Sequence, residues 1–361
     1  MIRPFQLGDF FLVQRLGRQA TKLNAIQALL QPGSPSITAF NSLIPRFSAR
    51  GSTHVLRQNR NTLAHAGFLQ AQKRPGRPES DIMLLAPSLE TSWGHPAIWE
   101  KLLSHYAQEA ARLQIARIYA DVPDQPLLVN TFSQVGFKPY TRQTIWRLTH
   151  INRTLQALPE KRARSVSIRP QHKEDEWNMR RLYERVTPLP VQHSEGVAQS
   201  DTEQSVKPLI LDWWQSGNHQ TYVLEQNGDI EGCILLGFGA RGYWMRMLVD
   251  TLNPDVDAMA SLLQYGLRVI HEINLSRRPI YVGVRDYHGG MAALLGEFGF
   301  APFTDRARMV RYVHAWAREP VFQRLPALEK AVGKAIPTTY TFPRSSQNPS
   351  KAASILLGTK E

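Results

Sequence analysis

Apolar residues in the first 150 positions recur at two spacings, which predict strands and helices in turn. Alternation over residues 53–58 and 62–70 predicts a hairpin that turns at 59–61, and the apolar run 81–86 predicts a buried strand. Pro96, a residue suited to a first helical position, precedes a stretch with helical spacing. The apolar residues of that stretch are Ile98, Leu102, Tyr106, Ala110 and Leu113. The remaining elements are predicted as a strand at 116–122, a short helix at 127–135 closed by Gly136, and a strand at 144–148.

The second half of the chain repeats this order. Strands at 222–225 and 230–238 flank Asn227-Gly228-Asp229, a hairpin turn sequence because Asn and Gly tolerate positive φ. Further elements are predicted as a strand at 244–249, a long helix at 256–270, a strand at 280–284, a helix at 291–298 ended by Gly299, and a strand at 309–313. An antiparallel meander followed by a β-α-β-α-β passage predicts an α+β fold. We expect a mixed, mostly antiparallel sheet flanked by helices in each half.

Four short segments of the first half recur, in the same order and at similar offsets, in the second. Ile2-Arg3-Pro4 returns as Ile168-Arg169-Pro170, and THVLRQN at 53–59 returns as TYVLEQN at 221–227. Ile118-Tyr119 returns as Ile280-Tyr281, and VGFKPYT at 135–141 returns as FGFAPFT at 298–304. Collinear repeats of this kind predict two copies of one structural unit.

The repeat divides the chain of 361 residues into two domains of ordinary size. We expect an N-terminal domain at 1–157, a polar, basic linker at 158–165, and a C-terminal domain at 166–320. Residues 321–361 are rich in Thr, Ser and Pro and are expected to form a basic, flexible tail.

The closing passage of each half resembles the GNAT superfamily of acyl-CoA-dependent N-acetyltransferases. That superfamily ends with a strand, a short helix that runs into a Gly-Phe pair, and a last strand. The two matching passages read IYADVPDQPLLVNTFSQVGFKPYTRQTIWRL and IYVGVRDYHGGMAALLGEFGFAPFTDRARMVRYV. The resemblance covers 1–150 and 165–318, and it implies two tandem GNAT-like domains.

The resemblance implies that acetyl-CoA, the acyl donor, lies in a V-shaped opening between the middle strand and its neighbour. The pyrophosphate would be held by backbone N–H groups in the loop before the long helix, where the helix end favours an anion. By position, the cofactor-binding candidates of the first half are Leu85, Ala86, Ser92, Trp93, Gly94, His95, Ala97 and Asn130. The family pattern Arg/Gln-x-x-Gly-x-Gly/Ala is reduced here to one glycine, Gly94, and Pro96 removes one donor.

The equivalent loop of the second half, at 251–257, has no glycine and carries Asp255 and Asp257. These carboxylates would repel a phosphate, so electrostatics favours the N-terminal half as the acyl-CoA site. Many family members place a Tyr four residues before the Gly-Phe glycine, where it protonates the leaving thiolate. Phe132 and Leu295 stand at those positions, so no catalytic residue is assigned.

Composition adds an electrostatic preference. Lys and Arg total 43 against 30 Asp and Glu, a formal net charge of +13 that favours anionic partners such as CoA. Nucleic acid is a further anionic candidate, but no basic motif supports it. The single cysteine, Cys233, lies in an apolar run and is expected to be a buried strand thiol. No histidine spacing indicates a metal site, and no membrane-spanning stretch is present, which predicts a cytoplasmic protein without a membrane partner.

Three functions remain compatible with the sequence. The leading hypothesis is an acyl-CoA-dependent N-acetyltransferase acting on a small-molecule or peptide amine. The second is a catalytically inactive tandem GNAT that serves as a binding or regulatory module for an anionic partner. The third is a tandem-GNAT peptidyltransferase that uses aminoacyl-tRNA, ranked last because the long helical hairpin typical of such enzymes is not visible.

Overall fold

The structure is a computed structural model that describes residues 1–44, 51–57, 66–151, 167–196, 219–226, 228–250, 256–273 and 278–313. The chain divides into two compact units, Met1–Ala315 and Trp316–Glu361, and all described residues belong to the first. The linker expected at 158–165 and the tail expected at 321–361 lie outside the described residues, as does the turn at 59–61. Below, residues 1–151 are the N-terminal half and residues 167–313 the C-terminal half.

The described elements of the N-terminal half begin with a short strand and helices before the predicted meander. Its strands are β1 (Ile2–Pro4), β2 (Thr21–Lys22), β3 (Gly51–Leu56), β4 (Gly67–Lys73), β5 (Glu79–Ala86), β6 (Arg117–Pro123) and β7 (Lys138–Leu148). Its helices are η1 (Leu7–Asp9), α1 (Phe10–Gly17), α2 (Ala25–Leu30), α3 (Pro35–Asn41), α5 (Pro96–Arg112) and α6 (Pro126–Gln134). Pro96 is the first residue of α5, as expected.

The C-terminal half repeats this order. Its described strands are β8 (Ser167–Pro170), β9 (His219–Gln226), β10 (Asp229–Phe238), β11 (Tyr243–Val249), β12 (Ile280–Arg285) and β13 (Ala301–Tyr312). Its described helices are η2 (Lys173–Asp175), α8 (Glu176–Val186), α9 (Leu189–Ser194), α11 (Val256–Ile273) and α12 (Met291–Glu297). Gly136 and Gly299 adopt φ of 85° and 77° after α6 and α12, and Gly228 adopts 85° between β9 and β10, so the predicted turn glycines are confirmed.

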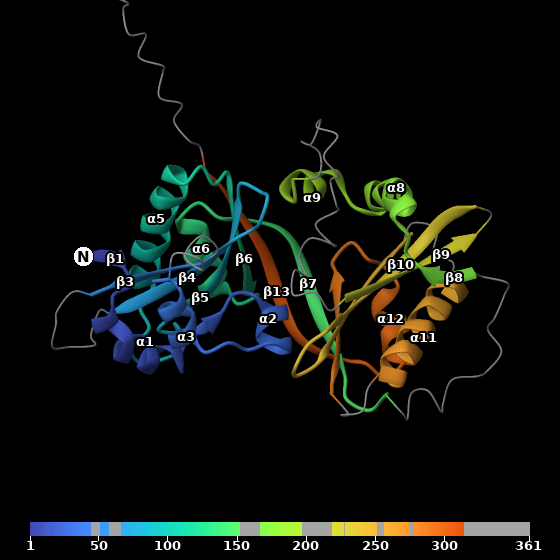
Figure 1. Cartoon of the computed structure of the whole chain (residues 1–361), viewed down its shortest axis with the longest axis horizontal. Helices are drawn as coiled ribbons and strands as arrows, with labels where there is room; N and C mark the ends of the chain where they lie inside the picture. Colours follow the sequence, from blue (N-terminus) through green and yellow to red (C-terminus); the bar gives the residue numbers. More distant parts are fainter. Residues whose placement is uncertain are drawn as a thin grey trace, which may run out of the picture. The chain divides into compact units, whose positions relative to one another are not determined.

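All these strands belong to one sheet, in the order β1-β3-β4-β5-β6-β13-β7-β12-β11-β10-β9-β8, with β2 beside β5. The halves exchange their last strands. β13 of the C-terminal half pairs with β6 of the N-terminal half, and β7 pairs with β12 of the C-terminal half. β7 and β13 also pair with each other, and Figure 1 shows the two running side by side. Neither half therefore completes its sheet from its own residues.

Helices cover both faces of the N-terminal strands. On one face α5 and α6 bury Trp99, Leu102 and Phe132 against β4, β5 and β6, and Met309 of β13 joins this core. On the other face α1 and α3 pack on β3, β4 and β5. Trp99 and Phe132 are fully buried, and their ring centroids lie 6.0 Å apart.

The C-terminal strands are covered in the same way. One face carries α11 and α12, which pack on β10, β11 and β12. The other carries α8, which packs on Cys233, Leu235 and Leu248. Cys233 is buried on β10, and burial raises its thiol pKa to about 12, so the expected buried strand thiol is confirmed.

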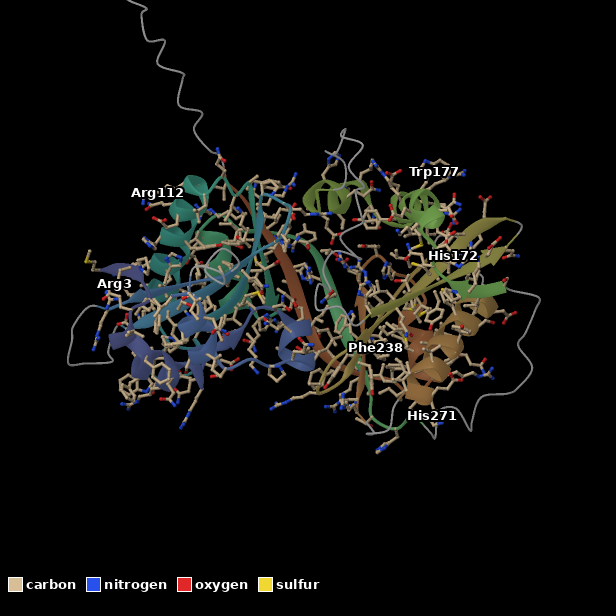
Figure 2. The ribbon with its side chains drawn as sticks, in the orientation of Figure 1. Arg3, Arg112, His172, Trp177, Phe238 and His271 are labelled. Carbon is tan, nitrogen blue, oxygen red and sulfur yellow. The ribbon has the colours of Figure 1, made fainter. Side chains whose placement is uncertain are left out.

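The repeat extends to an ion pair at the start of each half. Arg3 Nη1 lies 2.7 Å from Asp9 Oδ2, and Arg169 Nη1 lies 2.8 Å from Asp175 Oδ2. Asp175 also accepts the backbone N–H of His172, as Asp9 accepts that of Gln6. Figure 2 labels Arg3 and His172 near the outer strands of the two halves. Matching side-chain contacts at matching positions support a common origin of the two halves.

The sheet and helix predictions differ from the structure mainly at element ends. The described part of the predicted strand 62–70 begins as β4 at Gly67, and residues 62–65 lie outside the described residues; β7 and β13 begin well before residues 144 and 309. The additional residues of β7 and β13 follow the Gly-Phe pairs, where Pro139 and Pro302 interrupt the strand pattern. Long pairings with the other half hold these residues in the sheet.

Candidate functional site

Each half contains a place where its two central parallel strands diverge. In the N-terminal half, β5 and β6 pair in parallel from Glu79↔Arg117 to Ile82↔Ala120. In the C-terminal half, β11 and β12 pair from Tyr243↔Ile280 to Met245↔Val282. Beyond these residues the strands no longer pair with each other. The resemblance to the GNAT superfamily predicts that an acyl-CoA lies in an opening of this kind.

The N-terminal opening is filled by the chain itself. β2 pairs with β5 through Thr21↔Leu85 and Lys22↔Leu84, on the edge that faces β6. Leu23, which is 1% exposed, links both strands, since its N–H donates to Met83 O at 2.9 Å and its carbonyl accepts the Asp121 N–H at 3.0 Å. Residues 19–25, here called the plug, therefore occupy the gap between β5 and β6.

Both ends of the plug are fixed as well. The Ser88 N–H donates to Gln19 O at 2.7 Å, and the Ala25 N–H donates to Asp121 Oδ2 at 3.0 Å. Asp121 is also bonded by Arg306 of β13, which donates to Lys22 O as well. The plug is thus tied to a strand that the C-terminal half contributes.

The predicted cofactor residues of the N-terminal half lie around this plugged opening. Leu85 and Ala86 are buried on β5, and Leu85 pairs with Thr21 of β2. Ser92, Trp93 and His95 are exposed in the loop before α5. Ala97 follows as the second residue of α5, and Asn130 is exposed on α6.

Several N–H groups of the loop before α5 are hydrogen-bonded within the loop itself. The Gly94 N–H donates to Thr91 O at 2.9 Å, and the Ala97 N–H donates to His95 Nδ1 at 3.2 Å. A Cβ on Gly94 would collide with the Ser88 carbonyl, so the bare face of this glycine packs on its own loop. The tight turn of the loop therefore accounts for the presence of glycine at this position, and no bound phosphate is needed to explain it.

The C-terminal opening differs from the N-terminal one. β11 pairs along its length with β10 on one edge, and with β12 on the other edge only as far as Met245. Among the residues that the structure describes, no strand pairs with β11 beyond Met245 on that second edge. Arg246 is the first residue past the parallel pairing, at the start of this open edge.

Arg246 belongs to a group of polar side chains on the face of the sheet that carries α8. We call this group the Glu195 cluster; its members are Tyr183, Glu195, Arg246, Arg285, Tyr287 and His288. Glu195 Oε1 lies 2.6 Å from Arg285 Nη2, and Glu195 Oε2 accepts the Tyr183 hydroxyl at 2.6 Å. Glu195 and Arg285 are 3% and 4% exposed, so this ion pair is excluded from water.

The turn after α9 places Glu195 in the cluster. Tyr119 of β6 donates to the carbonyl of Ser194 at 2.8 Å, which anchors the end of α9 on the N-terminal half. Gly196 follows with φ of 76°, and a Cβ there would lie 2.5 Å from Arg117 Nη1. The positive φ favours glycine at this position, because other residues rarely adopt it. The cluster of the C-terminal half is thus held by residues of both halves.

The charges of the cluster are unequal. Burial opposes ionisation of Glu195, but Arg285, Arg246 and the Tyr183 hydrogen bond outweigh it and lower its pKa to about 2. Burial, together with Arg285 and Arg246, lowers the pKa of His288 to about 3, so this imidazole is neutral near pH 7. Two guanidinium groups therefore face one carboxylate. Arg246 Nη2, Arg285 Nη1 and His288 Nε2 are buried and have no hydrogen-bond partner among the described residues.

The family position of the general acid is apolar in both halves. Phe132 and Leu295 are completely buried in the cores under α6 and α12. Burial raises the pKa of Tyr287, in the turn after β12, so its hydroxyl stays protonated at neutral pH. This hydroxyl was not predicted, although three polar residues, Asp286-Tyr287-His288, come shortly after the strand predicted at 280–284 and are a signal that could have indicated it.

Within the described residues, no group of three or more His, Cys, Asp or Glu side chains is arranged to hold a metal ion. In the same part of the chain, no helix has both the length and the apolar composition needed to cross a membrane.

The described part of the chain has the fold of the tandem GCN5-related N-acetyltransferases. It is similar to a GCN5-related N-acetyltransferase from Sphaerobacter thermophilus, with a TM-score of 0.50 and 12% identity over 87% of this chain and 96% of that one. A tandem GNAT protein from the clavulanic acid biosynthesis pathway aligns with a TM-score of 0.49 and 14% identity over 87% of this chain and 98% of that one. No family model and no curated protein matches the sequence. At these identities the similarity concerns the fold.

Proposed function

We propose that this chain is an acyl-CoA-dependent N-acyltransferase that uses acetyl-CoA as donor, and that the donor lies in the C-terminal opening between β11 and β12. The observation that carries the proposal is the difference between the two openings. The edge of β11 beyond Met245 has no partner strand among the described residues, whereas the equivalent edge of β5 is taken by the plug. The pantetheine arm of CoA carries amide groups that pair with such an edge as a strand does.

Two opposing effects bear on the choice between the halves. A donor in the N-terminal opening has to displace the plug, which loses four hydrogen bonds of Gln19, Leu23 and Ala25, the β2–β5 pairing, the Arg306 bond to Lys22 O and the burial of Leu23. At about 1 kcal/mol for each bond and about 2 kcal/mol for the side chain, those four bonds and Leu23 alone contribute on the order of 6 kcal/mol. The carboxylates of Asp255 and Asp257 oppose a donor in the C-terminal half, and one pair of like charges 4 Å apart costs about 1 kcal/mol in bulk water and about 4 kcal/mol near a protein surface.

The sequence-based site at Leu85, Ala86, 92–97 and Asn130 remains the alternative placement of the donor. It needs a form of the protein in which the plug has left β5. The loop before α5 would then contribute its unbonded N–H groups.

The Glu195 cluster supplies groups for the chemistry. We propose that Arg246 stabilises the negative charge that develops on the thioester oxygen when the amine attacks, through its Nη2, which has no hydrogen-bond partner among the described residues. We further propose that the Tyr287 hydroxyl gives its proton to the CoA thiolate as the C–S bond breaks, in place of the family tyrosine, and that the resulting tyrosinate takes up the proton that the attacking nitrogen loses, so that the amide, the free thiol and neutral Tyr287 result. Glu195 is bonded to Arg285 and Tyr183, so its role is to hold these side chains in position.

Tyr287→Phe is expected to lower kcat about 100-fold and to leave KM for acetyl-CoA within about twofold, because the proton is needed only as the thiolate leaves. Turnover is measured as release of the free CoA thiol from acetyl-CoA in the presence of spermidine, glucosamine or a peptide with a free amino terminus. Tyr222→Phe, on β9, is the matched control and is expected to keep wild-type rates, because its hydroxyl is bonded to Gln220 in an exposed position outside the Glu195 cluster. Equal rates for wild type and Tyr287→Phe would refute the role of this residue.

A binding module without catalytic activity is the second candidate function. The observation that favours it is the loss of both family positions for the general acid, since Phe132 and Leu295 are buried and apolar. If the chain is such a module, no CoA thiol is released from acetyl-CoA with any of the three amines. A ligand that binds only the native state still raises the melting temperature, so a thermal shift without turnover would support the module.

A further inference from the structure

A pocket of about 800 Å³ lies in the N-terminal half. It is formed where α1, the plug, α2 and α3 meet β4 and β5. None of the cofactor candidates derived from the sequence lines it. Its volume is in the range that small-molecule sites occupy.

The charges around this α1–α3 pocket all have one sign. Arg18 and Lys22 line it, and none of the described residues that line it is Asp or Glu. Neither cation forms an ion pair within the described residues, and both side chains are exposed. A cationic or amine ligand would find no counter-charge here, whereas an anionic group would find two.

The rest of the lining is rich in neutral hydrogen-bonding groups. The amide side chains are Gln14, Asn24, Gln27, Asn41, Gln70 and Gln72, and several Ser and Thr hydroxyls join them. The side chains of Gln14, Gln27 and Asn41 make no hydrogen bond to the described residues. These groups can pair with several hydroxyls of a ligand.

Part of the lining is held in place before any ligand arrives. Gln70 is 4% exposed, and its Nε2 donates to Pro35 O at 2.8 Å and to Thr53 Oγ1 at 3.3 Å. Asn24 Oδ1 accepts the Gln27 N–H at 3.0 Å at the start of α2. A preformed lining lowers the ordering cost of binding.

We propose that the α1–α3 pocket binds a small polyhydroxylated anion, a sugar carrying a phosphate or a carboxylate. Arg18 and Lys22 hold the anionic group, and the amides bind the hydroxyls. The proposal does not depend on the acyltransferase proposal, because the pocket shares no residue with the β11–β12 opening. Lys22 and Asn24 belong to the plug, so the bound ligand also fastens the plug on β5.

The test is isothermal titration of the full chain with glucose 6-phosphate, gluconate, glucose and inorganic phosphate. Binding of glucose 6-phosphate or gluconate is expected, with the tighter of the two identifying the anionic group. Glucose and inorganic phosphate are each expected to bind at least tenfold more weakly, because each lacks one half of the recognised chemistry. Failure of both sugar anions to bind would overturn the proposal.

Substitutions of the two cations test whether the ligand binds in the α1–α3 pocket. Arg18→Gln and Lys22→Gln are each expected to weaken binding roughly tenfold or more, since each removes a charge-assisted hydrogen bond. Arg15→Gln, exposed on α1 and outside the pocket, is the matched control and is expected to leave binding unchanged. Arg18 and Lys22 have no ion pair to lose within the described residues, so the melting temperature of these variants without ligand stays at the wild-type value. Binding that is equal in all three variants would overturn the placement.

Hydrogen exchange gives a second readout of the same site. Because the ligand fastens the plug, the Leu23 and Asp121 amides, which are both bonded through the plug, are expected to exchange more slowly with glucose 6-phosphate bound. Slower exchange confined to the C-terminal half would contradict a site in the α1–α3 pocket. Acetyl-CoA binding is measured separately, so either proposal can fail alone.

Discussion

A chain that ends at Gly299, before β13, is expected to lose the folded structure of both halves. β13 pairs with β6 along its second part and with β7 along most of its length. Its loss leaves two strand edges unpaired in the middle of the sheet and removes Ala307 and Met309 from the N-terminal core. Far-ultraviolet circular dichroism and thermal melting are expected to show no cooperative transition.

A chain that ends at Pro320 keeps every described strand and is the control, expected to melt at the wild-type temperature. The isolated residues 1–157 are expected to fail as a folded monomer too, because they lack β13 and leave β7 without β12. A cooperative transition near the wild-type temperature in the chain ending at Gly299 would show that the exchanged strands contribute little to stability.

Glu195→Ala is expected to lower the free energy of unfolding by about 3–5 kcal/mol, because it leaves Arg285 and Arg246 buried without their carboxylate. The measurement is urea denaturation at pH 7. Glu184→Ala removes an ion pair of similar length, Arg180–Glu184 at 2.8 Å, but in an exposed position on α8. That control is expected to cost only about 0.3–0.5 kcal/mol. A cost below about 1 kcal/mol for Glu195→Ala would contradict the account of the cluster.

The same ion pair has a defined pH dependence. The pKa of Glu195 is lowered to about 2 in the folded state, against about 4.3 for an unfolded glutamate. The stability that it contributes is therefore complete above pH 5 and is lost as the pH falls through 4.3 toward 2. The difference between wild type and Glu195→Gln should accordingly stay constant from pH 7 to 5 and shrink below.

Much of the sheet and its helices follows from short-range sequence features. The periodicity of residues 96–113 and 256–270 predicts α5 and α11, and the glycines that close α6 and α12 mark the ends of these helices. The exchange of β7 and β13 could not be predicted in this way. Both partners of each new pairing have ordinary strand patterns, and pairing between residues far apart in the sequence leaves no local trace.

The candidate site was only partly predictable. The family pattern predicted an opening between two central strands, and β5–β6 and β11–β12 do stop pairing partway along their length. The role of the loop before α5 in binding CoA stays a prediction. The plug was missed because two residues of strand, Thr21 and Lys22, give no periodic signal. The Glu195 cluster was missed because Glu195 and Arg285 are 90 residues apart and meet only through the turn at Gly196.

Titration of acetyl-CoA into three forms of the protein tests the central claim, a donor bound in the C-terminal half. Asp255→Lys changes the charge before α11 by two units, and Ser92→Glu with Trp93→Glu changes the exposed loop before α5 by two units in the opposite sense. With the donor between β11 and β12, Asp255→Lys is expected to tighten binding roughly three- to thirtyfold, and the double variant is expected to bind as wild type. Weaker binding in the double variant, with no change in Asp255→Lys, would contradict the C-terminal placement, and no binding of acetyl-CoA to any form would contradict the acyltransferase proposal itself.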